Sequence, residues 1–170
     1  LKQKVLFAAA APVGGWIDGS CEIGRIARTL AFLRVTLRSG RHTVLTADGC
    51  FRLFDGAMPP ARTSQATAPA APAGFKPFRL QGTFPSLYGP MQYRREADGR
   101  YTCGLASHAG HDNSTGSVHG GVLFAFADDL MGRAVSATTR RYGSPVALAV
   151  TSLEAPPHGA SLAGRADTLG

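Results

Sequence analysis

The sequence lacks the features that would place it in a membrane or an oxidising compartment. It has no run of about 18 uncharged apolar residues, which is the length a membrane-spanning helix needs. Its three cysteines, Cys21, Cys50 and Cys103, are far apart and form no Cys-x-x-Cys pair, so no disulfide framework is expected. The five histidines fit no common zinc spacing. We therefore expect a cytoplasmic protein without a metal.

Motifs for nucleic-acid binding are also missing: we find no zinc finger, helix-turn-helix or aromatic RNA-reading motif. The chain nevertheless carries 18 Lys and Arg against 11 Asp and Glu, a net charge of +7 that suits an anionic partner. The basic residues are scattered, so a solvated surface explains them equally well. A small phosphorylated ligand is the sharper interpretation, and a small nucleic-acid binder stays the alternative from another class.

The N-terminal residues have a superficial likeness to a secretory signal. Two lysines precede an apolar run from Val5 to Val13, but charge is mixed into the run and no clean Ala-x-Ala site follows. We interpret Leu1 to Phe7 as a strand and keep a signal peptide as the alternative. At 170 residues, the chain is long enough for one domain with a real core.

The first third of the chain predicts an antiparallel meander. Its strand-forming runs are separated by a hairpin turn at residues 38–41 and a turn or bulge at Asp48-Gly49. We expect strands over residues 15–23, 29–37, 42–47 and 50–54. This meander, residues 1–55, is followed by a Pro-, Ala-, Ser- and Thr-rich stretch. That stretch, residues 56–74, predicts a flexible linker or terminal arm.

The region from 75 to 153 contains a second strand pair, a helix and another strand. Residues 88–96 and 101–107 predict the pair, and residues 146–153 the later strand. The helix is expected from about His119 to Thr139, with an apolar stripe at helical spacing and a stop at Gly143-Ser144-Pro145. Residues 154–170 are weakly patterned, and read as a tail, an inserted loop or a duplicate strand. One long helix with about six antiparallel strands predicts an α+β fold, with the helix packed on one curved sheet.

The most informative segment lies just before and within this helix, in the stretch His111 to Asp129. It resembles the signature of the PaaI-like hotdog-fold acyl-CoA thioesterases: an Asn, a Gly, a His-Gly-Gly that opens the central helix, and an acid nine residues later. The matching positions are Asn113, Gly116, His119, Gly120, Gly121 and Asp128. The resemblance extends over residues 1–54 and 75–153 and implies the hotdog fold, in which a curved sheet wraps one long helix. The order differs from the family's, because residues 1–54 resemble segments that normally follow the helix. The chain therefore reads as a circular permutation.

Thioester cleavage passes through an oxyanion, which needs hydrogen-bond donors aimed at it and a base or nucleophile opposite. Gly120 and Gly121 open the helix, where free amides and the positive end of the dipole are found. By resemblance, the Gly120 amide is the preferred donor. Asp128 is the corresponding general base or nucleophile and reaches across a dimer interface, with Asp129 as the reserve candidate.

Other residues receive supporting roles. Asn113 is expected to orient the thioester or the water, and His119 to cap and order the loop more than to transfer protons. The substrate-binding candidates are Gly116, Gly121, Thr151, Arg140 and Arg141, the two arginines because coenzyme A carries several phosphates. The arginines equally suit the negative end of the helix dipole.

The resemblance implies hydrolysis of acyl-CoA to free acid and coenzyme A by a dimer or tetramer. No cofactor is expected apart from the coenzyme A of the substrate. We weigh two alternatives within the fold: a non-catalytic acyl-CoA-binding module and a hotdog dehydratase or hydratase. Neither a membrane nor a nucleic acid is expected as a partner.

Overall fold

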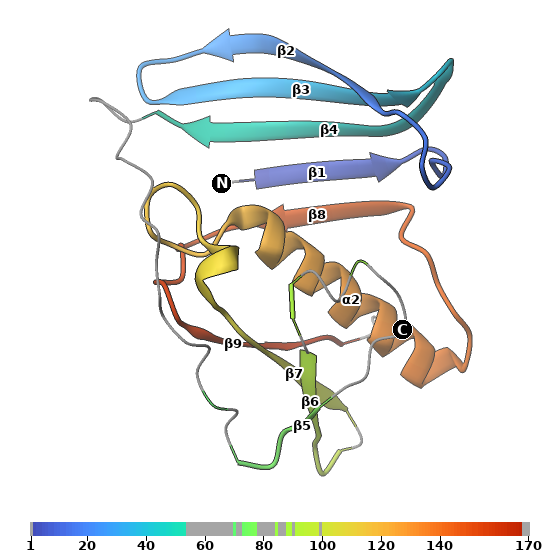
Figure 1. Cartoon of the computed structure of the whole chain (residues 1–170), viewed down its shortest axis with the longest axis vertical. Helices are drawn as coiled ribbons and strands as arrows, with labels where there is room; N and C mark the ends of the chain where they lie inside the picture. Colours follow the sequence, from blue (N-terminus) through green and yellow to red (C-terminus); the bar gives the residue numbers. More distant parts are fainter. Residues whose placement is uncertain are drawn as a thin grey trace. The chain divides into compact units, whose positions relative to one another are not determined.

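The computed structural model describes residues 2–53, 70, 73–77, 84, 88, 89, 91–98 and 100–167 (Figure 1). The chain divides into two compact units. Unit 1 comprises Leu1–Ala57 and Ser144–Leu153, and unit 2 comprises Met58–Gly143 and Glu154–Gly170. Most of the linker expected over residues 56–74 lies outside the described residues. No helix in the described part of the chain is long and apolar enough to span a membrane.

Unit 1 is built on a five-stranded antiparallel sheet with the order β2-β3-β4-β1-β8. Its strands are β1 (Lys2–Phe7), β2 (Asp18–Ile26), β3 (Leu30–Ser39), β4 (His42–Arg52) and β8 (Ala147–Thr151). The meander and the strand at the N-terminus agree with the sequence. Residues paired across strands share a face, and the register places Val35 beside Ala47 and Leu37 beside Leu45 on an apolar face.

The turn or bulge expected at Asp48-Gly49 is wrong, because β4 continues through both residues in regular register with β3. The Asp48 carboxylate pairs with Arg34 on the neighbouring strand, at 2.8 Å between Oδ1 and Nε. Gly49 leaves room for the ring of Phe51, since a Cβ there would lie 3.0 Å from Phe51 Cε2. A glycine within a strand here permits close packing and does not interrupt pairing.

Unit 2 contains a four-stranded antiparallel sheet and the long helix α2 (Gly120–Thr139), which packs on β7 and β9. The sheet order is β5-β6-β7-β9, with β5 (Lys76–Pro77), β6 (Met91–Arg95), β7 (Tyr101–Ala106) and β9 (Ser161–Arg165). The helix contributes Phe126 and Leu130, one turn apart, to the core. The other buried members are Tyr88, Met91, Cys103 and Leu105. A helix packed on an antiparallel sheet agrees with the predicted α+β class, although the strands are shared between two sheets.

Three details differ from the expected boundaries or choose between alternatives. The helix ends before the expected stop at residues 143–145, because Arg140 adopts a left-handed conformation (φ 57°) and its amide donates to the Ser136 carbonyl. Residues 154–170 read in the sequence as a tail, an inserted loop or a duplicate strand, and the structure has a strand there, β9. Strand β8 lies antiparallel beside β1 and does not continue into it. The permuted order of the segments stays a prediction.

Candidate functional site

The loop before the helix is organised around a buried histidine. His111 ends a short 3-10 helix (Ala109–His111) and is only 1% exposed. Its Nδ1 accepts a hydrogen bond from the His108 amide at 3.3 Å, its carbonyl accepts one from the His119 amide at 2.7 Å, and its ring lies 3.8 Å from the His108 ring. Burial and the neighbouring His108 lower the pKa of His111, against an opposing effect of Asp112. A neutral His111 therefore joins the loop to the start of the helix.

Asn113 holds the next turn of this loop together. Its side-chain oxygen accepts hydrogen bonds from the Thr115 amide (2.8 Å), the Thr115 hydroxyl (2.7 Å) and the Ser117 amide (3.2 Å). Its side-chain nitrogen donates to Ser117 Oγ at 2.9 Å. Gly116 takes a positive φ of 81° in the same turn, which favours glycine. The amide oxygen of Asn113 is thus occupied, and its nitrogen has one further hydrogen to offer a substrate.

A second contact ties the loop to the segment before β9. Asp112, whose side chain is 6% exposed, lies 2.5 Å from Nδ1 of His158. Alongside it, the Val118 amide donates to the Pro156 carbonyl at 3.0 Å. Sequence reasoning missed this pair, because the two residues are far apart in the chain and neither is one of the motif's matching positions. The pair anchors the loop that carries Asn113.

At the helix N-terminus, one backbone amide is left open. His119 is the N-cap, and its Nδ1 accepts a hydrogen bond from the Gly121 amide at 2.9 Å. The Val122 amide donates to the His119 carbonyl. The Gly120 amide has no hydrogen-bond partner among the described residues, and a Cβ on Gly120 would meet nothing within 4 Å. Of the two expected oxyanion donors, Gly120 is therefore available, whereas Gly121 serves the cap.

The two acids of the helix differ in their surroundings. Both are half-buried, and burial raises the pKa of each carboxyl. For Asp129, the cation of Arg133 one turn later opposes this shift; for Asp128, burial is the cause. Asp128 lies eight residues after Gly120, which is about 12 Å along the axis at about 1.5 Å per residue. One helix therefore does not bring this acid and the open amide to the same thioester.

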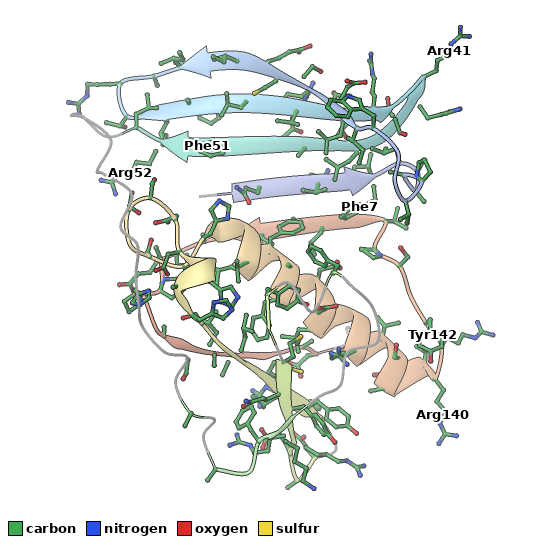
Figure 2. All side chains as sticks on the ribbon, in the orientation of Figure 1. Phe7, Arg41, Phe51, Arg52, Arg140 and Tyr142 are labelled. Atoms are coloured by element: carbon green, nitrogen blue, oxygen red, sulfur yellow. The ribbon has the colours of Figure 1, made fainter. Side chains whose placement is uncertain are left out.

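Of the expected substrate-binding residues, Gly116 and Gly121 lie at or just before the start of the helix, whereas the two arginines lie at its other end. Arg140 and Arg141 follow the last turn of the 20-residue helix, about 30 Å from Gly120, and Arg140 projects away from the helix end (Figure 2). Thr151 lies on β8 in unit 1. The described residues also contain no group of three His, Cys, Asp or Glu side chains that could hold a metal ion.

The described residues form two large cavities, one in each unit. The unit 2 cavity of about 590 Å³ is bordered by the second half of the helix and by strands β6 and β7. Its charged lining residues are Arg95, Asp98, Arg100, Arg133 and Asp167. The unit 1 cavity, about 1090 Å³, is lined by residues of all five strands. Neither is lined by His119, Gly120 or Asp128. His119, Gly120 and Gly121 are exposed, so the candidate site is an exposed helix end.

The comparisons with known proteins were made by sequence and by structure. No family model matches the sequence, and no curated protein matches it. Among solved structures, a proposed thioesterase from Novosphingobium aromaticivorans is similar, with a TM-score of 0.63 and 18% identity over 93% of this chain. A protein of unknown function with a hot dog fold from Alicyclobacillus acidocaldarius has a TM-score of 0.61 and 19% identity over 92% of this chain.

A third similar structure is a proposed thioesterase II from Thermobifida fusca, with a TM-score of 0.56 and 16% identity over 87% of this chain. The matched regions cover 63%, 60% and 60% of the lengths of the three proteins, in the order given. At these identities, the likeness is one of fold. The helix on its antiparallel sheet and these three structures together show that the chain has the hotdog fold.

Proposed function

We propose that the protein hydrolyses acyl-CoA thioesters. The observation that carries the proposal is the open amide of Gly120 at the helix N-terminus, with free space above its Cα. The proposed thioesterases among the similar structures support the same reaction class. The finer assignment to a PaaI-like enzyme acting on coenzyme A esters rests on the motif from Asn113 to Asp128.

The chemistry follows from the position of this amide. Attack on a thioester carbonyl places negative charge on its oxygen, and a preorganised donor lowers the energy of that state. The Gly120 amide lies at the positive end of a 20-residue helix, which adds to the stabilisation of an anion. The absence of a Cβ allows the carbonyl to approach the amide closely. His119 keeps the first turn in place by capping it.

Asp128 supplies the base or nucleophile in this proposal. Its raised pKa makes it a better proton acceptor than an ordinary aspartate while leaving a carboxylate available above that pKa. Because it is about 12 Å from Gly120 along one helix, it acts on a thioester bound at the Gly120 of a second subunit. Two antiparallel helices related by a twofold axis near their first half would place each acid beside the other's amide, giving two sites per dimer.

The test is release of coenzyme A from a panel of acyl-CoA esters by the wild-type protein and two matched variants. Asp128→Asn should lower kcat by about 100-fold or more with little change in KM, because the carboxylate acts in the chemical step. Asp129→Asn, with the same substitution one residue later, should retain most of the activity. Absence of thioester hydrolysis by the wild type would refute the function. A severe loss in Asp129→Asn with a nearly normal Asp128→Asn would refute the residue assignment.

A further inference from the structure

A strand-turn-strand segment occurs twice in the chain. Residues 1–22 and 146–167 align without a gap, and related residues such as Ile17 and Leu162 also coincide. The identical pairs are Val5 and Val150, Ala10 and Ala155, Pro12 and Pro157, Gly14 and Gly159, Gly19 and Gly164. The backbones agree at the turn, where Gly14 has a φ of 77° and Gly159 a φ of 69°. Such a repeat is also an alternative to circular permutation as an explanation of why residues 1–54 precede the helix.

The first strands of the two copies meet symmetrically in the unit 1 sheet (Figure 1). Lys4 pairs with Ala149, which is its own counterpart in the repeat. In the repeat, Gln3 corresponds to Leu148 and Val5 corresponds to Val150. In the sheet, Gln3 pairs with Val150 and Val5 pairs with Leu148, so each residue pairs with the counterpart of the other. This is the register that a local twofold axis through the Lys4–Ala149 pair produces. The first strands of the two segments are thus paired about corresponding residues.

In unit 2, the turn and second strand of the second copy contact three elements: the hairpin of β6 and β7, the loop before the helix, and α2. Strand β9 pairs with β7, so that Leu162 lies opposite Leu105 and Gly164 opposite Cys103. On the same face, a Cβ on Gly164 would lie 2.7 Å from Leu130 Cδ2, so the helix touches the strand at this glycine. The turn before β9 binds the loop, through the Pro156 carbonyl and the pair formed by His158 and Asp112 described above.

In unit 1, the corresponding positions of the first copy are open. Val13, the counterpart of His158, is 105% exposed, Trp16 is 80% exposed and Ile17, the counterpart of Leu162, is 47% exposed. All nine residues of β2 are exposed, and β2 ends its sheet with no described strand on its outer side. Long unpaired edges are normally paired or covered in proteins.

The face that Gly19 belongs to is suited to a helix. Gly19 pairs with Leu37 and Cys21 pairs with Val35, so both lie on one face of the unit 1 sheet. In the second copy, the counterpart of Gly19 is Gly164, and it is the corresponding face that contacts the helix there. Apolar residues extend this face across the neighbouring strands: Leu33, Val35 and Leu37 of β3, and Leu45 and Ala47 of β4. The first copy thus retains the turn glycine, Gly19 and the apolar face, whereas Val13 stands where the second copy has His158.

We infer that this surface, formed by residues 9–26 and the apolar face beside Gly19, binds a second hairpin-loop-helix polypeptide of the kind formed by Met91–Thr139. Its inner strand pairs antiparallel with the outer edge of β2, as β7 pairs with β9. Its loop lies on the turn at Gly14, covering Val13 and Trp16. Its helix places an apolar stripe over Gly19 and the adjoining β3 and β4 side chains. This partner completes a second hotdog core on the strands of unit 1.

The probe for this binding is a separately prepared polypeptide with the sequence of residues 88–143, added to the full 170-residue chain. We expect a one-to-one complex by sedimentation, and hydrogen exchange at least about tenfold slower at the amides of β2, because strand pairing protects them. The β9 amides should be unaffected. Cys21→Arg places a charge on the helix-binding face and should abolish the complex, whereas Ser20→Arg, on the opposite face of the same strand, should leave it intact.

A second arm removes the dependence on folding of the free probe. The same segment is joined by a flexible linker to the N-terminus of the full chain, where its effective concentration is high. If exchange in β2 is unchanged in both arms, the inference is wrong. It is also overturned if the probe displaces the chain's own hairpin and alters β9 exchange. Slow exchange at the β2 amides without any probe would show that β2 pairs with β2 of a second copy of this chain, and would equally overturn the inference.

Discussion

Replacing Gly120 with alanine tests the proposed oxyanion site with little cost to the fold. A Cβ at this position meets nothing within 4 Å, and Gly120 has no positive φ that alanine would strain. Alanine is favoured over glycine in helices by roughly 0.5–1 kcal/mol, and by less at the first helical residue. We therefore expect a free energy of unfolding that is unchanged or up to about 1 kcal/mol higher. For 170 residues, this corresponds to a rise in Tm of up to about 3 °C.

The same methyl group should reduce activity. It occupies the space through which a thioester carbonyl would reach the Gly120 amide, while the amide itself remains. Loss of one oxyanion donor costs about 100- to 1000-fold in kcat in well-studied hydrolases. Partial obstruction should therefore lower kcat/KM by roughly 100-fold. The measurement is steady-state release of coenzyme A, beside thermal unfolding of the same preparation.

The matched control is Gly132→Ala. Gly132 lies in the same helix, more than three turns later, and a Cβ there also meets nothing within 4 Å. This variant should be as stable as Gly120→Ala, or more so, and fully active. Retained activity in Gly120→Ala, or an equal loss in both variants, would refute the oxyanion assignment. A large loss of stability in Gly120→Ala would contradict the open space above Gly120.

Four further outcomes are expected. Burial raises the pKa of Asp128 above the ordinary aspartate value of 3.8, and the carboxylate is the active form. As the pH decreases, kcat/KM should therefore fall with an apparent pKa above 3.8. A fall with an apparent pKa at or below 3.8 would contradict this role. A carboxyl whose pKa is raised in the folded state lowers the stability of the protein as the pH rises through that pKa. Asparagine carries no charge, so Asp128→Asn should melt at or above the wild-type temperature at pH 7, measured by calorimetry. Chelator treatment should leave activity intact, and a loss that zinc restores would disprove a metal-free mechanism. Mixing Asp128→Asn with Asn113→Ala subunits should restore part of the activity by forming one intact shared site, and no recovery despite confirmed subunit exchange would exclude shared sites.

The parts of the fold that sequence patterns predicted are those stabilised by local periodicity. The apolar stripe and the His-Gly-Gly start predicted α2 within one residue, because a helix with a capping side chain is specified by its own turns. The meander was predicted for the same reason, from alternation within single strands. Asp48-Gly49 was misread because β4 pairs with β3 on one side and with β1 on the other through both residues, and this pairing outweighs their local turn preference.

For the candidate site, the sequence alone determined which residues form the motif and that Gly120 opens the helix. Only the tertiary structure decided which donors are free, because the Gly121 amide is used by His119 and the Asn113 oxygen by Thr115 and Ser117. These hydrogen bonds depend on backbone conformations that residue identity does not specify.

Long-range relations were likewise decided only in three dimensions. The contact between Asp112 and His158, and the symmetric pairing of β1 with β8, join residues that are distant in the chain. A single sequence carries the side chains that make such contacts but not their distances, since pairing depends on how the intervening elements pack. The α+β class could thus be predicted from local patterns, and the hotdog fold from the resemblance of the motif to a known family. The open edge of β2 and its counterpart in β9 became visible only once the strands were placed in their sheets.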